Sequence, residues 1–446
     1  MPYRILSGRG ATEQPNTTGD GDVPLTPLFW LATLVTGVAA GLAGIATTEL
    51  LQLASRLAYG PDVVRGELAP VVERLGFGAR FTPLLVAGVV GGVGWYLLRR
   101  YVRGRTDVDD AIWTGDGRLG LRRSLGTAAL SQVFIGLGAS LGREAAPRLL
   151  GAAAGSVLAG RLRLSTPQRR LLVACGAGAG LASVYNVPLG AALFTAEVLI
   201  GTLRLPVVLP ALASSGVATL TAHLVLPDRA TYPALERGTT DARTLVWSLL
   251  AGPVVGLVAV AFVRLIALVS HRQPRTTAFR LLAPLGACLV LGVVGLAYPQ
   301  LYGNGQEMAQ LAFLGLSPIG LYAVLALLKP LVTCLFLGSG ASGGLFTPTL
   351  STGAVLGAAL GGLFGLVWPG GSVGAYALLG AAAMLGAGMQ APLAALALVL
   401  ELTHGGFELL VPLVLVTTIA TAVARRVDGY SIYSARLTAE HPPQAT

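Results

Sequence analysis

The sequence predicts an all-α integral membrane protein with many tilted and discontinuous helices, arranged in two inverted, structurally related halves. Of its 446 residues 54% are hydrophobic and 12% are charged, whereas soluble domains carry roughly a quarter charged residues. Apolar stretches long enough to cross a hydrocarbon core of about 30 Å recur along the chain. Five of them cover residues 27–53, 81–98, 245–269, 281–298 and 409–423. We therefore expect a multi-pass protein of the cell membrane that sits in the lipid bilayer.

The net charge of +10 comes almost entirely from arginines. These arginines stand singly or in pairs between apolar stretches, which argues against nucleic-acid binding. The basic stretches 99–105, 161–170 and 425–436 instead fit the positive-inside rule for cytoplasmic loops and helix ends. Residues 1–25 are polar and contain no apolar core typical of a signal peptide. We expect both termini to be cytoplasmic.

Shorter apolar segments, broken by glycine and proline, lie between the long ones. A helix that stops inside a bilayer is tolerated only where its end is buried in protein or lines a watery cavity. Broken helices therefore indicate a permeation site. The candidate segments are 145–158, 171–181, 346–356, 376–385 and 391–402.

Two of these broken segments have partners in the second part of the chain. The segment from Gly142 (Gly-Arg-Glu-Ala-Ala-Pro) matches one from Gly344 (Gly-Leu-Phe-Thr-Pro). A segment ending in Glu197 matches one ending in Glu401, and in both a proline stands nine residues before the glutamate. Both pairs are separated by about 200 residues. A duplication with inverted halves explains this spacing better than chance similarity between Gly-, Ala- and Leu-rich segments.

The duplication also predicts the division of the chain. We place the first transmembrane half at 26–225 and the second at 226–437. A polar cytoplasmic segment, 1–25, precedes them, and a cytoplasmic tail, 438–446, follows them.

The paired glycine-rich starts are suited to holding an anion. Glycine lets backbone N–H groups come close together, and the helix that follows adds about half a positive charge at its N-terminus. Such a site holds an anion without a full cation, so the anion can also leave. We expect the two helix starts, one from each half, to face each other and bind a small inorganic anion.

Three motifs resemble signatures of the CLC chloride channel and transporter family, of the prokaryotic type without cytoplasmic CBS domains. They are Gly142-Arg143-Glu144, the run Ser-Gly-Gly-Leu-Phe-Thr-Pro at 342–348, and Ser-Ile-Tyr-Ser at 431–434. The similarity spans roughly 39–437. It implies a homodimer with one anion pathway in each subunit, chloride as the bound substrate and no cofactor.

The resemblance also implies roles for individual residues. Glu144 is the gating glutamate, whose carboxylate occupies the anion path when ionised and swings away when protonated or displaced. Leu345 and Phe346 offer backbone N–H groups to the central anion, and Tyr433 offers its hydroxyl. Alternatively, Glu144 pairs with Arg143, and Tyr433 is an interfacial aromatic. The implied anion-binding set is Gly142, Arg143, Ala145, Leu345, Phe346 and Tyr433, with Thr106 as a further candidate.

Thr106 is a further candidate because the chain departs from the family pattern there. The family's Gly-Ser-Gly-Ile-Pro element should fall between Gly104 and Asp110, where this chain has Arg-Thr-Asp-Val-Asp. Either Thr106 supplies the missing hydroxyl, or the segment and its carboxylates stay away from the anion. We interpret the acidic cluster as a solvated loop. Its members are Asp107, Asp109, Asp110 and Asp116.

Two further departures concern the gate and the proton. The family's proline stands one place later, at Pro147, which sets the helix start after Glu144 slightly differently. Val198 occupies the position of the internal glutamate of proton-coupled members. The resemblance implies a proton-coupled chloride antiporter. Because of these departures we keep two alternatives, a passive voltage- or pH-gated anion channel and a fluoride exporter.

The remaining polar residues predict neither an enzyme nor a metal site. No nucleophile with a base and no paired aspartates stand in the apolar segments. The four histidines are scattered without metal-ligand spacing. The three cysteines, Cys175, Cys288 and Cys334, are expected to be packing residues. The single lysine, Lys329, stands in an apolar run and is expected either to snorkel or to meet a buried carboxylate or carbonyl.

Overall fold

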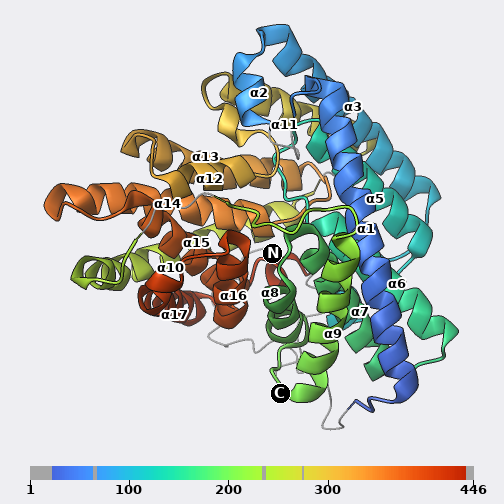
Figure 1. Cartoon of the computed structure of the whole chain (residues 1–446). Coiled ribbons are helices and arrows are strands. Elements are labelled where there is room, and N and C mark those ends of the chain that lie inside the picture. Colours follow the sequence, from blue (N-terminus) through green and yellow to red (C-terminus); the bar gives the residue numbers. More distant parts are fainter. Residues whose placement is uncertain (1–22, 64–67, 234–237, 274–275, 438–446) are drawn as a thin grey trace, which may run out of the picture.

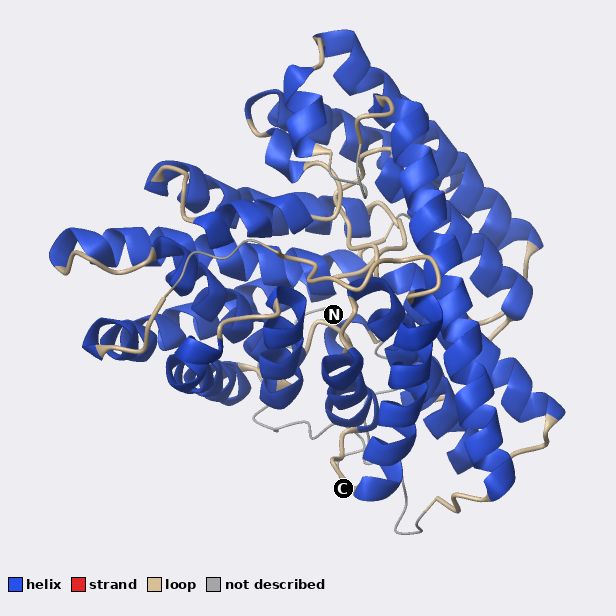
Figure 2. Ribbon diagram, viewed as in Figure 1, coloured by secondary structure: helices blue, strands red, loops and turns tan. Residues whose placement is uncertain are grey.

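The computed structural model describes residues 23–63, 68–233, 238–273 and 276–437, and its regular elements there are helices (Figure 2). Eight helices of this described part are long and apolar enough to cross a membrane. They are α1 (Pro27–Tyr59), α3 (Phe77–Tyr101), α9 (Leu205–Ala222), α10 (Ala242–His271), α11 (Thr277–Ala297), α13 (Ile319–Gly338), α14 (Phe346–Val367) and α17 (Leu410–Val427). The all-α membrane class is confirmed, and the five predicted long stretches lie in α1, α3, α10, α11 and α17. The predicted tail, 438–446, and residues 1–22 of the predicted N-terminal segment lie outside the described residues.

The segments predicted to be short helices are confirmed as helices, but four of the five are longer than expected, two of them by nine residues or more. They correspond to α6 (Ala145–Arg161), α7 (Thr166–Tyr185), α14, α15 (Val373–Met389) and α16 (Pro392–Thr403). The predicted bounds of α7 and α14 are wrong, because these helices have 20 and 22 residues. Their glycines do not end them: a Cβ on Gly357 would meet the Tyr376 carbonyl, and one on Gly180 would meet the Pro147 carbonyl. These glycines let neighbouring helices approach closely, as small residues do in membranes.

The second half repeats the helix order and the packing of the first. Helix α6 packs on α7 as α14 packs on α15, and α1 packs on α9 as α10 packs on α17. In Figure 1 most helices of the first half gather on one side and most of the second on the other, with α8 (Pro188–Leu193) and α16 side by side between them, whereas α11 packs on α3 of the first half. The other described helices are α2 (Ala69–Arg74), α4 (Val108–Trp113), α5 (Leu121–Gly136), α12 (Gln306–Leu314) and the π-helical η2 (Phe194–Ile200).

A reciprocal pair of carboxylates joins the two halves. Pro188 and Pro392 begin α8 and α16, and because proline has no N–H the first free donors follow them. Glu401 accepts two backbone hydrogen bonds from α8, at 3.0 and 2.6 Å. Glu197 accepts the equivalent two from α16, at 3.3 and 2.7 Å. The four donors are Leu189, Gly190, Leu393 and Ala394.

This reciprocity fixes how the halves are related. Each half supplies the carboxylate that caps a helix of the other half, and such an exchange of equivalent contacts is typical of two units related by a two-fold axis. Each helix start lies beside the far end of its partner, so the π-helical extension of α8 and helix α16 run antiparallel. Equivalent helices thus point in opposite directions, as the predicted inversion requires.

Apolar side chains fill the interior and also cover much of the outer face. Exposed positions on the long helices include Leu31, Val89, Leu250 and Val293. An apolar outer face of this extent is suited to a bilayer. The three cysteines are buried and not in disulfides, as predicted for packing residues.

The cross-capping carboxylates yield a first prediction. We expect Glu197→Ala and Glu401→Ala to lower the free energy of unfolding by similar amounts, about 1–3 kcal/mol each, since each leaves two backbone donors without a charged acceptor. Thermal unfolding in detergent measures the effect. Glu73→Ala, which removes an exposed carboxylate, is the control. A loss confined to one of the two glutamates would contradict the reciprocal arrangement.

Candidate functional site

Two glycines join the halves at the centre of the molecule. Gly142 and Gly344 exchange backbone hydrogen bonds of 2.8 and 2.7 Å, which bring the loops before α6 and α14 together. A Cβ on either glycine would overlap the Glu144 carboxylate. Only glycine at both positions leaves room for that carboxylate, and the prediction that the two helix starts meet is confirmed.

Glu144 lies at this junction as the N-cap residue of α6, and its side chain reaches the other half. One carboxylate oxygen accepts a hydrogen bond of 2.8 Å from the Phe346 backbone N–H at the start of α14. The other accepts bonds from the hydroxyls of Thr347, at 3.1 Å, and Tyr185, at 3.3 Å. The residue is 1% exposed. The carboxylate therefore occupies donors of the kind that bind small anions at helix N-termini.

Thr347 and Tyr185 are site residues that the sequence interpretation missed. Their hydroxyls lie 2.7 Å apart, so one of them can donate its single proton to the other while the other donates to Glu144. Thr347 follows Phe346 within the run at 342–348, so its place in that motif could have identified it from the sequence. Tyr185 is the last residue of α7, and it belongs to none of the motifs that identified the site from the sequence.

Two other residues predicted for the site, Arg143 and Ala145, adjoin Glu144 in the chain. The Arg143 carbonyl accepts a hydrogen bond of 2.7 Å from the Gln132 amide. Its guanidinium carbon lies 5.0 Å from the centroid of the Tyr185 ring, a cation–π distance. Ala145 begins α6, and Pro147 falls within its first turn, where proline is compatible with a helix.

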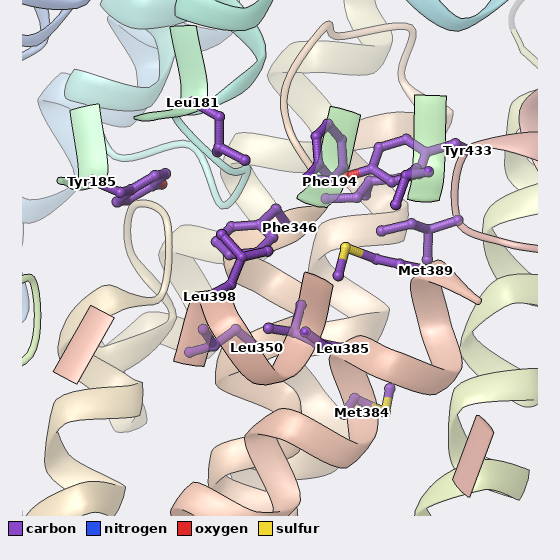
Figure 3. Close-up of a cluster of buried hydrophobic side chains, with 14 of the residues drawn as sticks. Leu181, Tyr185, Phe194, Phe346, Leu350, Met384, Leu385, Met389, Leu398 and Tyr433 are labelled. Carbon is purple, nitrogen blue, oxygen red and sulfur yellow. The ribbon is translucent and has the colours of Figure 1, made fainter. Parts of the chain in front are cut away.

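The second-half residues predicted for the site are also buried near the junction. Leu345 is the N-cap residue of α14. Tyr433 is 3% exposed, and its ring centroid lies 5.6 Å from that of Phe194. Figure 3 shows Tyr185, Phe346, Phe194 and Tyr433 in one buried cluster. Because Tyr433 lies inside the molecule, the alternative of an interfacial aromatic is wrong.

The acidic segment differs from its prediction. Asp109 is buried, and its carboxylate accepts a bond of 3.0 Å from the Arg148 guanidinium, so the expectation of a solvated loop is wrong for this residue. Asp107 and Asp110 face outward: Asp107 caps α4, and Asp110 pairs with Arg105. The Thr106 hydroxyl makes no hydrogen bond within the described part of the chain. Asp109 is buried because it pairs with the buried Arg148. The sequence around Asp109 gives no indication of this distant partner.

Lys329 is fully buried rather than snorkelling. Its ammonium group donates to the Ser140 hydroxyl at 2.8 Å and to the Gly303 carbonyl at 3.1 Å. Ser140 lies two residues before Gly142, so this lysine supports the loop that carries the junction. The prediction that it meets a buried carbonyl is confirmed.

Comparison with known proteins agrees with this architecture. The family described as "Voltage gated chloride channel" matches residues 84–425, which is more than half of the chain. The chain belongs to the CLC family of chloride channels and transporters. A "Voltage-gated ClC-type chloride channel ClcB" of Salmonella dublin is 32% identical over 416 residues, covering 90% of this chain and 97% of the relative. The protein of the same description from Citrobacter koseri is 31% identical, with 92% and 99% covered.

Solved CLC structures share the fold. A slow cyanobacterial Cl⁻/H⁺ antiporter superimposes with a TM-score of 0.79 at 22% identity, covering 92% of this chain and 97% of the other. A CLC-type fluoride/proton antiporter gives 0.74 at 24% identity, with the same coverage. At these identities the likeness shows a shared fold, and what the site can bind is argued from the residues of this chain.

The glycine junction provides a second prediction. We expect Gly344→Ala to destabilise the protein by about 1–3 kcal/mol, because the added methyl group displaces the Glu144 carboxylate from the Phe346 N–H. Thermal unfolding in detergent measures this. Gly365→Ala, in the helix α14 that follows Gly344 and with open space around the glycine, is the matched control. Equal stability of the two variants would show that the carboxylate does not depend on this glycine.

Proposed function

We propose that the chain exchanges chloride for protons across the cell membrane, with Glu144 as the gate. The observation that carries the proposal is the Glu144 carboxylate on the Phe346 N–H, flanked by two hydroxyls, at the junction of the two halves. A carboxylate and a chloride ion carry the same charge and compete for the same donors. Occupation by one therefore excludes the other.

The exchange follows from the charge of the carboxylate. When Glu144 is ionised, its charge-assisted hydrogen bonds hold it on the start of α14. A proton removes the charge and weakens those bonds, so the side chain leaves and an anion takes the donors. The Leu345 and Phe346 N–H groups and the Tyr433 hydroxyl then hold chloride. Gly142, Arg143 and Ala145 shape the opposite side of the path.

The inner proton route is the point on which the second candidate function depends. Val198 is fully buried and cannot carry a proton. The neighbouring Glu197 carboxylate is engaged by α16. A channel that passes anions without protons needs no inner acid, so Val198 favours this alternative over exchange. Fluoride is a third substrate to test, since a fluoride/proton antiporter shares the fold.

The wider assembly belongs to the same proposal. We infer a homodimer with one anion path in each subunit, no cofactor, chloride as the bound substrate and protons as the second cargo. Both termini lie in the cytoplasm, since basic residues cluster near the ends of α3 and α17. The two halves cover 26–225 and 226–437.

Reconstituted liposomes under a chloride gradient test the function. We expect chloride efflux to drive opposing proton movement, recorded as external pH. In Glu144→Gln we expect chloride flux to persist and proton movement to be lost, because the amide cannot take up a proton. Glu73→Gln, at an exposed carboxylate, is the matched control and should behave as wild type.

The other outcomes separate the alternatives. Chloride flux without proton movement in the wild type would make the protein a channel. Flux of fluoride but not chloride would make it a fluoride transporter. No flux of chloride, nitrate or fluoride would overturn the proposed function.

A further inference from the structure

Arg148 and Asp109 form a buried ion pair beside the proposed anion path. Their nitrogen and oxygen lie 3.0 Å apart, and the residues are 8% and 7% exposed. The guanidinium carbon lies 4.8 Å from the centroid of the Tyr433 ring and 5.0 Å from that of Phe194. A full positive charge therefore lies against the aromatic residue that is proposed to hold chloride.

The position of Arg148 in its helix is unfavourable for a cation. It stands in the first turn of α6, and its backbone N–H donates to the Glu144 carbonyl. The positive end of the helix dipole lies here and favours negative charge. The arginine thus depends on an anionic partner, and in this structure Asp109 is that partner.

Two buried donors at this point have no partner in the described part of the chain. They are Nε of Arg148 and the Tyr433 hydroxyl. A buried donor without an acceptor costs about 1–3 kcal/mol. Asp109 satisfies one edge of the guanidinium and leaves the edge carrying Nε for another acceptor. A small anion between the guanidinium and the hydroxyl would satisfy both donors.

Asp109 is placed so that it can release the arginine without loss of the fold. It stands on α4, and that helix is anchored by other contacts. The Trp113 indole donates to the Leu199 carbonyl at 2.7 Å, and Asp107 caps the first turn. The ion pair is therefore one of several contacts that hold α4 in place.

We propose that Arg148 is a charged ligand of the anion that the Tyr433 hydroxyl holds and that Asp109 is its built-in competitor. The anion binds the Nε edge of the guanidinium together with the Tyr433 hydroxyl, and the Asp109 carboxylate on the same guanidinium opposes it by its like charge. The proposal rests on the proposed function, because the anion must reach this site along the transport path. It assigns to this chain a charged anion ligand, in addition to its backbone and hydroxyl donors.

Chloride binding to purified protein, measured by isothermal titration calorimetry, tests the site. We expect Asp109→Asn to raise the chloride affinity about tenfold, since it removes the competing charge and keeps the shape. In Asp109→Asn/Arg148→Gln, which is neutral at this point, we expect the gain to vanish and the affinity to fall below that of wild type. Asp428→Asn, which removes the carboxylate from the exposed Arg264 pair, is the matched control and should leave the affinity unchanged.

The outcomes distinguish this inference from the proposed function. Wild-type protein that transports no anion in liposomes overturns the proposed function. Wild-type transport together with equal chloride affinities in all four proteins overturns the role of Arg148 and Asp109 alone. A double variant that keeps the tenfold gain also overturns it, because the gain would then not involve Arg148. If Asp109→Asn does not fold, the neutral double variant decides: an affinity equal to that of wild type excludes that role.

Discussion

Free N–H groups at the starts of buried helices are the constraint on which the rest of this structure depends. No water at bilayer depth can satisfy them, so the protein must supply acceptors. Four glutamates do this, each for a helix of the opposite half: Glu197 for α16, Glu401 for α8, Glu307 for α2 and Glu144 for α14. The same type of interaction therefore joins the two halves and places the negatively charged Glu144 carboxylate on a helix N-terminus between them.

The symmetry of the halves is broken at the gate. Gly142 and Gly344 are equivalent and bond to each other, and two residues later stand Glu144 and Phe346. One of these supplies the carboxylate and the other supplies the N–H that binds it. Glu197 and Glu401, by contrast, are equivalent and serve each other's halves as matched caps. A symmetric scaffold thus carries one asymmetric carboxylate, and this asymmetry distinguishes the proposed gate from the two matched caps.

Sequence alone predicted the features that depend on chain order and missed those that depend on contacts between distant residues. The paired prolines and glutamates reveal the duplication because matched residues recur at one spacing. Glu144 is recognisable because a carboxylate in an apolar segment is costly. Asp109 was misread because acidic runs are usually solvated, and only the fold brings Arg148 to it. The length of α14 was underestimated because its glycines serve helix packing and do not end the helix.

Charge balance connects the gate with the buried arginines. Arg143 lies over the Tyr185 ring and Arg148 over the Tyr433 ring. The two arginines on either side of Glu144 in the chain therefore both lie against aromatic rings. The ring faces partly offset cations that the helix dipole disfavours. Under the proposed exchange an anion replaces a carboxylate of equal charge, and the field of these arginines is unchanged. The displaced carboxylate is still buried, so it must take up a proton or reach water, and the first outcome couples anion to proton at Glu144 itself. In the proposed exchange, coupling would therefore begin at Glu144, and the residue at position 198 would affect only how the proton leaves.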